Sequence, residues 1–168
     1  FCLSRGLGDV YKRQEYEFVK DRPRRSLLKL AALLHDIGKP ARKTIDEHGR
    51  TRFFNHQMDG AAMVTDIGTR LKLANRETSS LAKVVEYHMY PLGLCVHFQK
   101  PIGARDKDRA LRRFIQNTGS DWLAILMISF ADLRATQGPW RKAKDLSDLE
   151  RLIGKIASIY FQEVQSPM

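Results

Sequence analysis

Apolar residues recur every three to four positions along most of the chain, which is the period of an amphipathic α-helix. The pattern begins at Leu27 and Leu30 and continues through Ala31 and Leu34. Gly38 and Pro40 are then expected to end this first helix, since glycine is common just past a helix end and proline cannot continue one.

The same period predicts further helices downstream. After a break at 75–77, Leu81, Val84, Val85 and His88 fall on one stripe, which places the histidine on a buried face. The other helices are expected at 55–73, at 110–118 before Gly119, from Trp122 to about Gln137, and from about Asp145 onward. Pro91 and Gly93 are expected to stop the helix that carries His88, with a linker at 94–105.

The segment 41–54 is the one stretch where strands are considered. Its polar turn at 46–49 lies between Thr44-Ile45 and Thr51-Arg52, so a small hairpin or an irregular loop would fit equally. No repeat and no sustained alternation occurs elsewhere, so the predicted fold class is an all-α bundle.

The composition indicates the size of the domain and the cellular compartment of the protein. The chain has 168 residues, of which 43% are hydrophobic and 29% charged, as expected of one globular domain. The longest apolar run, 123–128, is too short to span a bilayer, and no signal peptide is evident. Cys2 and Cys95 form no disulfide or zinc-ribbon pattern, so a soluble cytoplasmic protein without a membrane partner is expected.

Both ends of the chain look cut. Residues 1–14 begin without methionine, show no helical or strand period, and resemble translated adapter sequence. We therefore expect 1–14 to be a non-native or disordered segment and 15–168 to be the truncated domain.

The formal net charge of +10 makes an anionic partner plausible, because clustered Lys and Arg displace counterions from phosphates. One basic cluster contains Arg112 and Arg113, which we predict to contact RNA. The alternative is that these residues lie on an ordinary solvated helix face.

Candidate chemistry begins at His35-Asp36, where an apolar helix ends in two adjacent polar groups. Imidazole suits transition metals, and a carboxylate adds the negative charge that helps to hold Mg²⁺, Mn²⁺ or Fe. Asp132 lies seven residues after Ile125, on a helix that is apolar nearly all round, so a buried carboxylate paired with a cation is expected. Pairing of Asp132 with Arg113 or Arg134 is the alternative.

Taken singly, the other histidines favour ordinary structural roles. His56 would be an exposed residue at a helix start, His88 a satisfied core histidine, and His48 and His97 surface residues. Lys39 could neutralise a phosphate or simply cap the preceding helix.

The order of these segments resembles one family. His-Asp-Ile-Gly-Lys-Pro at 35–40 is similar to the central motif of the HD phosphohydrolases, in the form found in bacterial tRNA nucleotidyltransferases (CCA-adding) and poly(A) polymerases. Segments 53–56 with 60–61, 85–88 and 130–132 follow in the order of the family's later motifs, and the likeness extends over about 26–160. The resemblance implies an HD-domain bundle of about five to seven helices.

The resemblance also implies roles. His35, Asp36 and Asp132 would hold a divalent metal (Mg, Mn, Ni, Co or Fe), and His56 and His88 would face the same pocket and bind phosphate or a second ion. The family has a further histidine ligand upstream, and this chain has no histidine before His35. The chain as given is therefore expected to bind metal weakly or not at all.

Three functions remain open at this point. The first is metal-dependent hydrolysis of nucleotide or RNA phosphoesters, in a parent protein with an N-terminal nucleotidyltransferase domain. The second is a catalytically silent helical domain that positions tRNA in that parent. The third is a signalling hydrolase that acts on guanosine tetraphosphate or cyclic dinucleotides, which has a less close local match.

Overall fold

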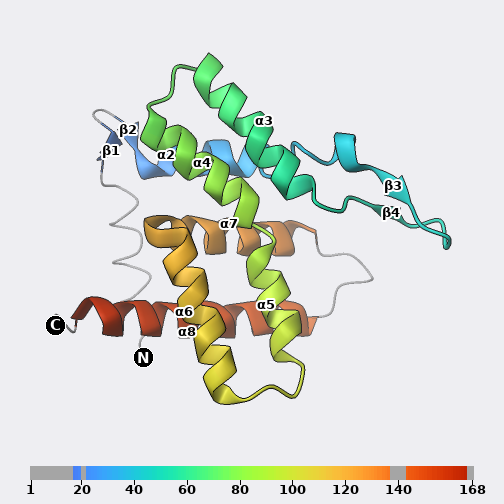
Figure 1. Cartoon of the computed structure of the whole chain (residues 1–168), viewed down its shortest axis with the longest axis vertical. Helices are drawn as coiled ribbons and strands as arrows, with labels where there is room; N and C mark the ends of the chain where they lie inside the picture. Colours follow the sequence, from blue (N-terminus) through green and yellow to red (C-terminus); the bar gives the residue numbers. More distant parts are fainter. Residues whose placement is uncertain (1–16, 20–21, 137–142, 166–168) are drawn as a thin grey trace. The chain divides into compact units, whose positions relative to one another are not determined.

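The computed structural model describes residues 17–19, 22–136 and 143–165 (Figure 1). The described residues form seven α-helices and four very short strands, so the predicted all-α class is confirmed. The helices are α2 (Arg24–Leu34), α3 (His56–Arg70), α4 (Asn75–Tyr87), α5 (Tyr90–Phe98), α6 (Ala104–Thr118), α7 (Trp122–Ala135) and α8 (Ala143–Gln165). The predicted non-native segment 1–14 and the predicted helix end at 138–139 lie outside the described residues.

The chain divides into two compact units, residues 1–86 and residues 87–168. In the first unit, β1 (Glu17–Val19) pairs antiparallel with β2 (Arg22–Pro23) ahead of α2. A short 3₁₀ helix, η1 (Pro40–Arg42), then leads into a hairpin of β3 (Thr44–Ile45) and β4 (Thr51–Arg52). The hairpin alternative for segment 41–54 is therefore confirmed.

Asp46 holds this hairpin together. Its carboxylate accepts hydrogen bonds from the backbone amides of His48 and Arg50, at 3.0 and 2.9 Å, and from Nε of Arg52 at 3.0 Å. Gly49, with a φ of +73°, takes the left-handed conformation that completes the turn.

Small residues on α3 allow α4 to approach closely. A Cβ built on Gly60 would lie 3.1 Å from Cγ1 of Val85, and one built on Gly68 would lie 2.7 Å from the side chain of Thr78. Val64 and Val85 are fully buried. The small residues of α3 thus bring the two helices into close contact.

The predicted break at 75–77 is wrong, because these residues form the first turn of α4. The buried carboxylate of Glu77 explains why: its Oε2 accepts a hydrogen bond from the backbone amide of Ala74 at 2.9 Å. A glutamate at this position reaches back to an amide that has no partner within the helix, and so stabilises a helix start rather than a break.

The helix expected to stop at Pro91 does end just before it, since α4 closes at Tyr87, but the predicted linker at 94–105 is wrong, because α5 runs from Tyr90 to Phe98. Pro91 lies in the first turn of α5, where a backbone N–H has no helical partner to lose. The connection is confined to about 99–103, and α6 begins directly after Gly103.

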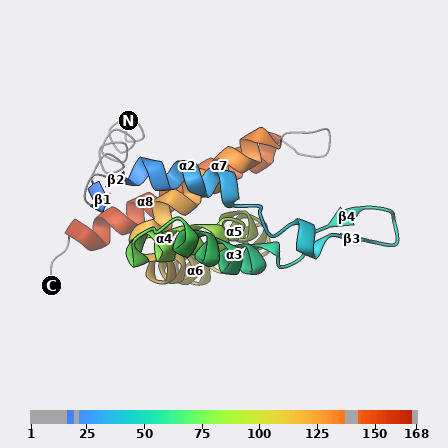
Figure 2. The ribbon, with the colours of Figure 1, turned by 90° about the horizontal axis from the view of Figure 1, so that it is seen from above.

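In the second unit, α5 and α6 cross α7 and α8, as the two views show (Figures 1 and 2). α7 is buried on most of its surface, as predicted from its apolar sequence, and Ile125 and Leu126 are completely enclosed. Leu149 and Ile156 line the inner side of α8, and the ring of Tyr160 lies 4.9 Å from that of Trp122.

Among the described residues, no helix is both long enough and apolar enough to cross a membrane.

The core of the second unit provides a test of stability. Leu149→Ala removes a side chain with no exposed surface and should lower the free energy of unfolding by about 2–5 kcal/mol through lost burial and a residual cavity. Urea denaturation followed by circular dichroism measures the change. Leu71→Ala, at a leucine that is 55% exposed, is the matched control and should change stability by less than about 0.5 kcal/mol.

Gly38 provides a second test, in the first unit. A Cβ at this buried position would fall on the carbonyl oxygen of His56 and 2.7 Å from the backbone nitrogen of Gly60. Both are backbone atoms at the start of α3 that cannot move aside cheaply, so Gly38→Ala should destabilise the protein by about 1–3 kcal/mol.

The control for Gly38 is Gly93→Ala in α5. No atom lies within 4 Å of a Cβ built there, so alanine should be neutral or stabilise the helix by up to about 1 kcal/mol. Equal melting temperatures for the two variants would contradict the close approach at Gly38.

Candidate metal centre

His35 and Asp36 lie where α2 ends. The helix closes at Leu34, with His35 as its C-terminal cap and Asp36 in the following turn. Two backbone hydrogen bonds shape this turn, from Ile37 to Leu34 at 3.1 Å and from Lys39 to Asp36 at 3.0 Å. His35 and Asp36 thus lie directly after the last residue of α2, in a turn whose backbone is held by local hydrogen bonds.

The ring of His35 is fixed by its own helix. Nδ1 donates a hydrogen bond to the carbonyl oxygen of Ala32 at 2.9 Å, because a carbonyl can only accept. The other ring nitrogen, Nε2, lies 3.3 Å from Oδ2 of Asp36.

His56 repeats this arrangement from another element. It is the first residue of α3, and Nδ1 donates to the carbonyl oxygen of Phe53 at 2.7 Å. Its Nε2 lies 3.2 Å from Oδ1 of Asp36. His56 is only 6% exposed, so the interpretation of an exposed helix-start residue is wrong. Asn55 precedes it with a φ of +61°, which turns the chain sharply and directs the histidine inward.

These contacts determine what the cluster can bind. With a proton on Nδ1, a neutral ring presents the lone pair of Nε2, and both rings present it toward the same carboxylate. Two lone pairs facing an anion are stable only with a proton or a cation between them. Histidines that bind metals are commonly held in this way, with the second nitrogen donating to a backbone carbonyl, so the donor set fits a divalent cation.

Lys39 supplies positive charge to the same carboxylate. Its Nζ contacts Oδ2 of Asp36, and it also lies 5.7 Å from the centre of the Phe53 ring. Partial burial acts to raise the pKa of Asp36, but hydrogen bonds from His35 and Lys39, together with their charges, outweigh it and hold the pKa well below its ordinary value. Asp36 is therefore an anion at neutral pH. Lys39 therefore contributes positive charge next to this carboxylate.

An ion pair that was not predicted anchors the chain beyond the site. The guanidinium of Arg42 in η1 binds the carboxylate of Asp59 on α3 through two contacts of 2.5 and 2.9 Å. The hydrogen bond from Arg42 lowers the pKa of Asp59. The two residues are 17 positions apart and match no motif, so the sequence offered no signal for their pairing.

His88 and Asp132 belong to the second unit. His88 follows α4 and is 1% exposed, which confirms its predicted burial. Its backbone carbonyl accepts a hydrogen bond from the hydroxyl of Ser129, a buried residue on α7 that was not predicted. Asp132 lies three residues further along α7 at a position of intermediate exposure, so the burial predicted for this residue is partial. It lies nearer the end of α7, where that helix is less completely enclosed.

The other predicted residues lie at exposed positions. His48 and His97 are on the surface, as predicted. Arg112 and Arg113 are exposed on α6.

Comparisons with known proteins identify the family of the chain. The HD domain family profile matches residues 2–112. An A-adding tRNA nucleotidyltransferase from Deinococcus radiodurans is 34% identical over 114 residues, which are 67% of this chain and 24% of that protein. A CC-adding tRNA nucleotidyltransferase from Thermus thermophilus is 31% identical over 116 residues, 68% of this chain and 24% of that protein.

The chain spans about a quarter of the length of these curated relatives. Its family is shown by the profile, which covers well over half of the sequence and includes the two histidines and the aspartate described above. The chain belongs to the HD domain family.

Proposed function

We propose that this HD domain is a metal-dependent phosphohydrolase that cleaves nucleotide or RNA phosphoesters. The observation that supports the proposal best is the carboxylate of Asp36 between two imidazoles, each with Nε2 within 3.3 Å of it and Nδ1 fixed on a backbone carbonyl. A structural ion pair does not require both Nδ1 atoms to be fixed on backbone carbonyls. It suits a site where a cation replaces the protons between the rings and the carboxylate.

In this proposal His35 and Asp36 hold the ion, and Asp132 contributes a second carboxylate. Support for Asp132 comes from the resemblance of 130–132 to the closing aspartate segment of the family and from its half-buried position on α7. A mixed set of imidazole and carboxylate ligands suits Mn²⁺, Fe, Co²⁺ or Ni²⁺, and the two carboxylates keep Mg²⁺ possible.

The cation supplies Lewis acidity when bound, which polarises the phosphoester and acidifies water. The chain's own residues then act on the substrate. Lys39 neutralises phosphate oxygens and His88 binds them, and His56, when its ring takes up a second proton at Nε2, can donate that proton to the leaving oxygen. The water oxygen forms the new bond to phosphorus and the P–O ester bond breaks. The leaving oxygen takes the proton of His56, and the proton released by the attacking water restores the protonation of that ring.

The wider context is also proposed. The relatives are named as tRNA nucleotidyltransferases and are about four times as long as the aligned segment. We infer that the domain belongs to a parent protein of that kind, with an N-terminal nucleotidyltransferase domain, in the cytoplasm. The polymerising chemistry would lie in that other domain.

Metal binding can be tested without any substrate. Calorimetric titration with Mn²⁺, on the protein extended upstream by its natural sequence, should show a site that His35→Ala and Asp132→Asn each weaken at least roughly tenfold. His48→Ala removes an exposed histidine from the hairpin and is the matched control. Equal Mn²⁺ affinities for His35→Ala and His48→Ala would remove the basis of the proposal.

Hydrolysis is a separate test on the same protein. With Mn²⁺, Co²⁺ or Ni²⁺ it should release nitrophenol from bis(p-nitrophenyl) phosphate, and His35→Ala or Asp132→Ala should abolish the reaction. The activity of His48→Ala should match the wild type. Metal binding without hydrolysis in the extended protein would favour the alternative of a silent domain that positions RNA.

A further inference from the structure

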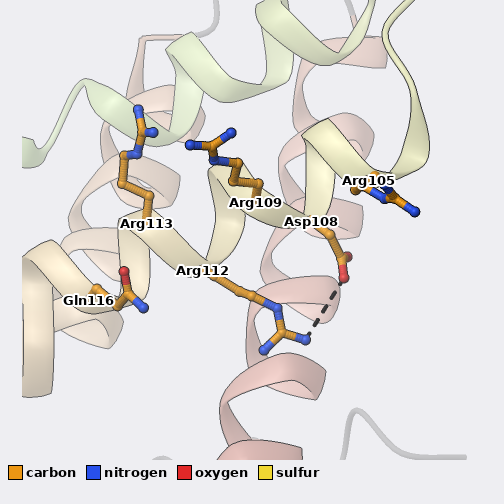
Figure 3. Close-up of a pocket in the computed structure, with 6 residues that line it drawn as sticks. All are labelled: Arg105, Asp108, Arg109, Arg112, Arg113 and Gln116. Atoms are coloured by element: carbon orange, nitrogen blue, oxygen red, sulfur yellow. Dashed lines mark ion pairs between the residues drawn. The ribbon is translucent and has the colours of Figure 1, made fainter.

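α6 has an arginine face on its solvent side. Arg105, Arg109, Arg112 and Arg113 are all exposed, and with Asp108 and Gln116 they line an open cavity of about 480 Å³ (Figure 3). Figure 3 shows Arg109 and Arg113 projecting in the same direction from successive turns, while Arg112 extends toward Asp108. We call these four residues the α6 arginine face.

The spacing of these arginines makes them a continuous row. Positions i, i+4, i+7 and i+8 lie on one side of a helix, and at about 1.5 Å per residue the row extends over about 12 Å. The opposite side of α6 is buried through Leu111, Phe114 and Thr118, which pack toward the core of the second unit. The row is therefore mounted on a helix that is held in place.

Three of the four arginines in the row form no ion pair with any residue that the structure describes. Elsewhere Arg42, Arg52 and Arg151 each pair with a carboxylate at 3.3 Å or less, and Arg112 pairs with Asp108 at 3.9 Å. Within the part of the chain that the structure describes, Arg105, Arg109 and Arg113 form no such pair. Like charges kept side by side without counterions are an unfavourable arrangement that an anionic ligand would relieve.

We propose that the α6 arginine face binds the phosphodiester backbone of a nucleic-acid strand. A single phosphate cannot reach guanidinium groups spread over about 12 Å, whereas a strand presents one phosphate per nucleotide along its length. The planar guanidinium binds phosphate oxygens through two hydrogen bonds, which explains arginine rather than lysine at all four positions.

The lining also indicates how the strand is recognised. Among the described residues it contains no aromatic side chain on which a base could stack, and Gln116 offers its one neutral amide. Binding is therefore to the backbone and independent of base sequence. The described lining also has no apolar side chain, which disfavours a lipid surface, where basic residues normally flank an apolar stripe. The proposal goes beyond hydrolysis and does not depend on the metal centre.

The test compares two variants that lose the same charge. Arg109→Gln/Arg113→Gln removes two positive charges from the α6 arginine face, and Arg70→Gln/Lys155→Gln removes two from exposed positions on α3 and α8. Fluorescence anisotropy with a labelled 20-nucleotide RNA, and with DNA of the same sequence, gives the affinity at several salt concentrations. All four side chains are exposed, so both variants should keep the wild-type melting temperature.

The wild type should bind with a linear dependence of log K on log salt. Loss of two phosphate contacts should weaken binding and reduce the magnitude of the slope by about 1.4 for a single strand, since each contact contributes about 0.7. The control should keep the wild-type slope. The strand that binds more tightly identifies RNA or DNA as the source of the phosphates.

Three results would overturn the proposal. The first is an unchanged affinity and slope in Arg109→Gln/Arg113→Gln. The second is an equal loss in the control, because net charge alone would then explain the binding. The third is displacement of the labelled strand by poly-L-glutamate as readily as by unlabelled strand at equal charge, which would assign the face to an acidic polypeptide.

Discussion

The candidate metal site depends on one carboxylate, that of Asp36, and on the two imidazoles that face it. Each imidazole has one nitrogen committed to a backbone carbonyl, at 2.9 Å for His35 and 2.7 Å for His56, so the other nitrogen can only be directed at the carboxylate. The tautomer and the orientation of both rings are thereby set by the backbone before any ligand arrives. Rings that are oriented before a ligand binds distinguish a ligand site from a chance cluster of polar groups.

The first unit is built so that these groups meet. Gly38 lets the turn after α2 come against the start of α3, where a side chain would collide with the carbonyl of His56. Asn55 takes a left-handed conformation directly before that histidine, and the Arg42–Asp59 ion pair ties the segment beyond the turn to α3. A glycine, a strained asparagine and an ion pair thus position one imidazole. None of them would contact a metal or a substrate.

Helical periodicity predicted the class of the fold and most of its helices, because burying an apolar stripe is a property of each segment by itself. It failed at α5 and at the start of α4, where local chemistry reverses the usual meaning of a residue: Pro91 begins a helix rather than ending one, and Glu77 supports a helix start where a break was expected. The burial of His56 and the partial exposure of Asp132 depend on packing between distant segments. The order of the HD motifs along the chain identified the candidate residues, but no sequence pattern indicates the carbonyls that orient the two histidines.

The central claim concerns an ion held by His35 and Asp36, with Asp132 as a further ligand. The most direct measurement is anomalous X-ray diffraction, at the manganese absorption edge, from crystals of the upstream-extended protein grown with Mn²⁺. The account predicts an anomalous peak within bonding distance of Nε2 of His35 and of carboxylate oxygens of both aspartates. A peak elsewhere, or an empty position between these side chains in crystals that bind Mn²⁺ at other places, would contradict it.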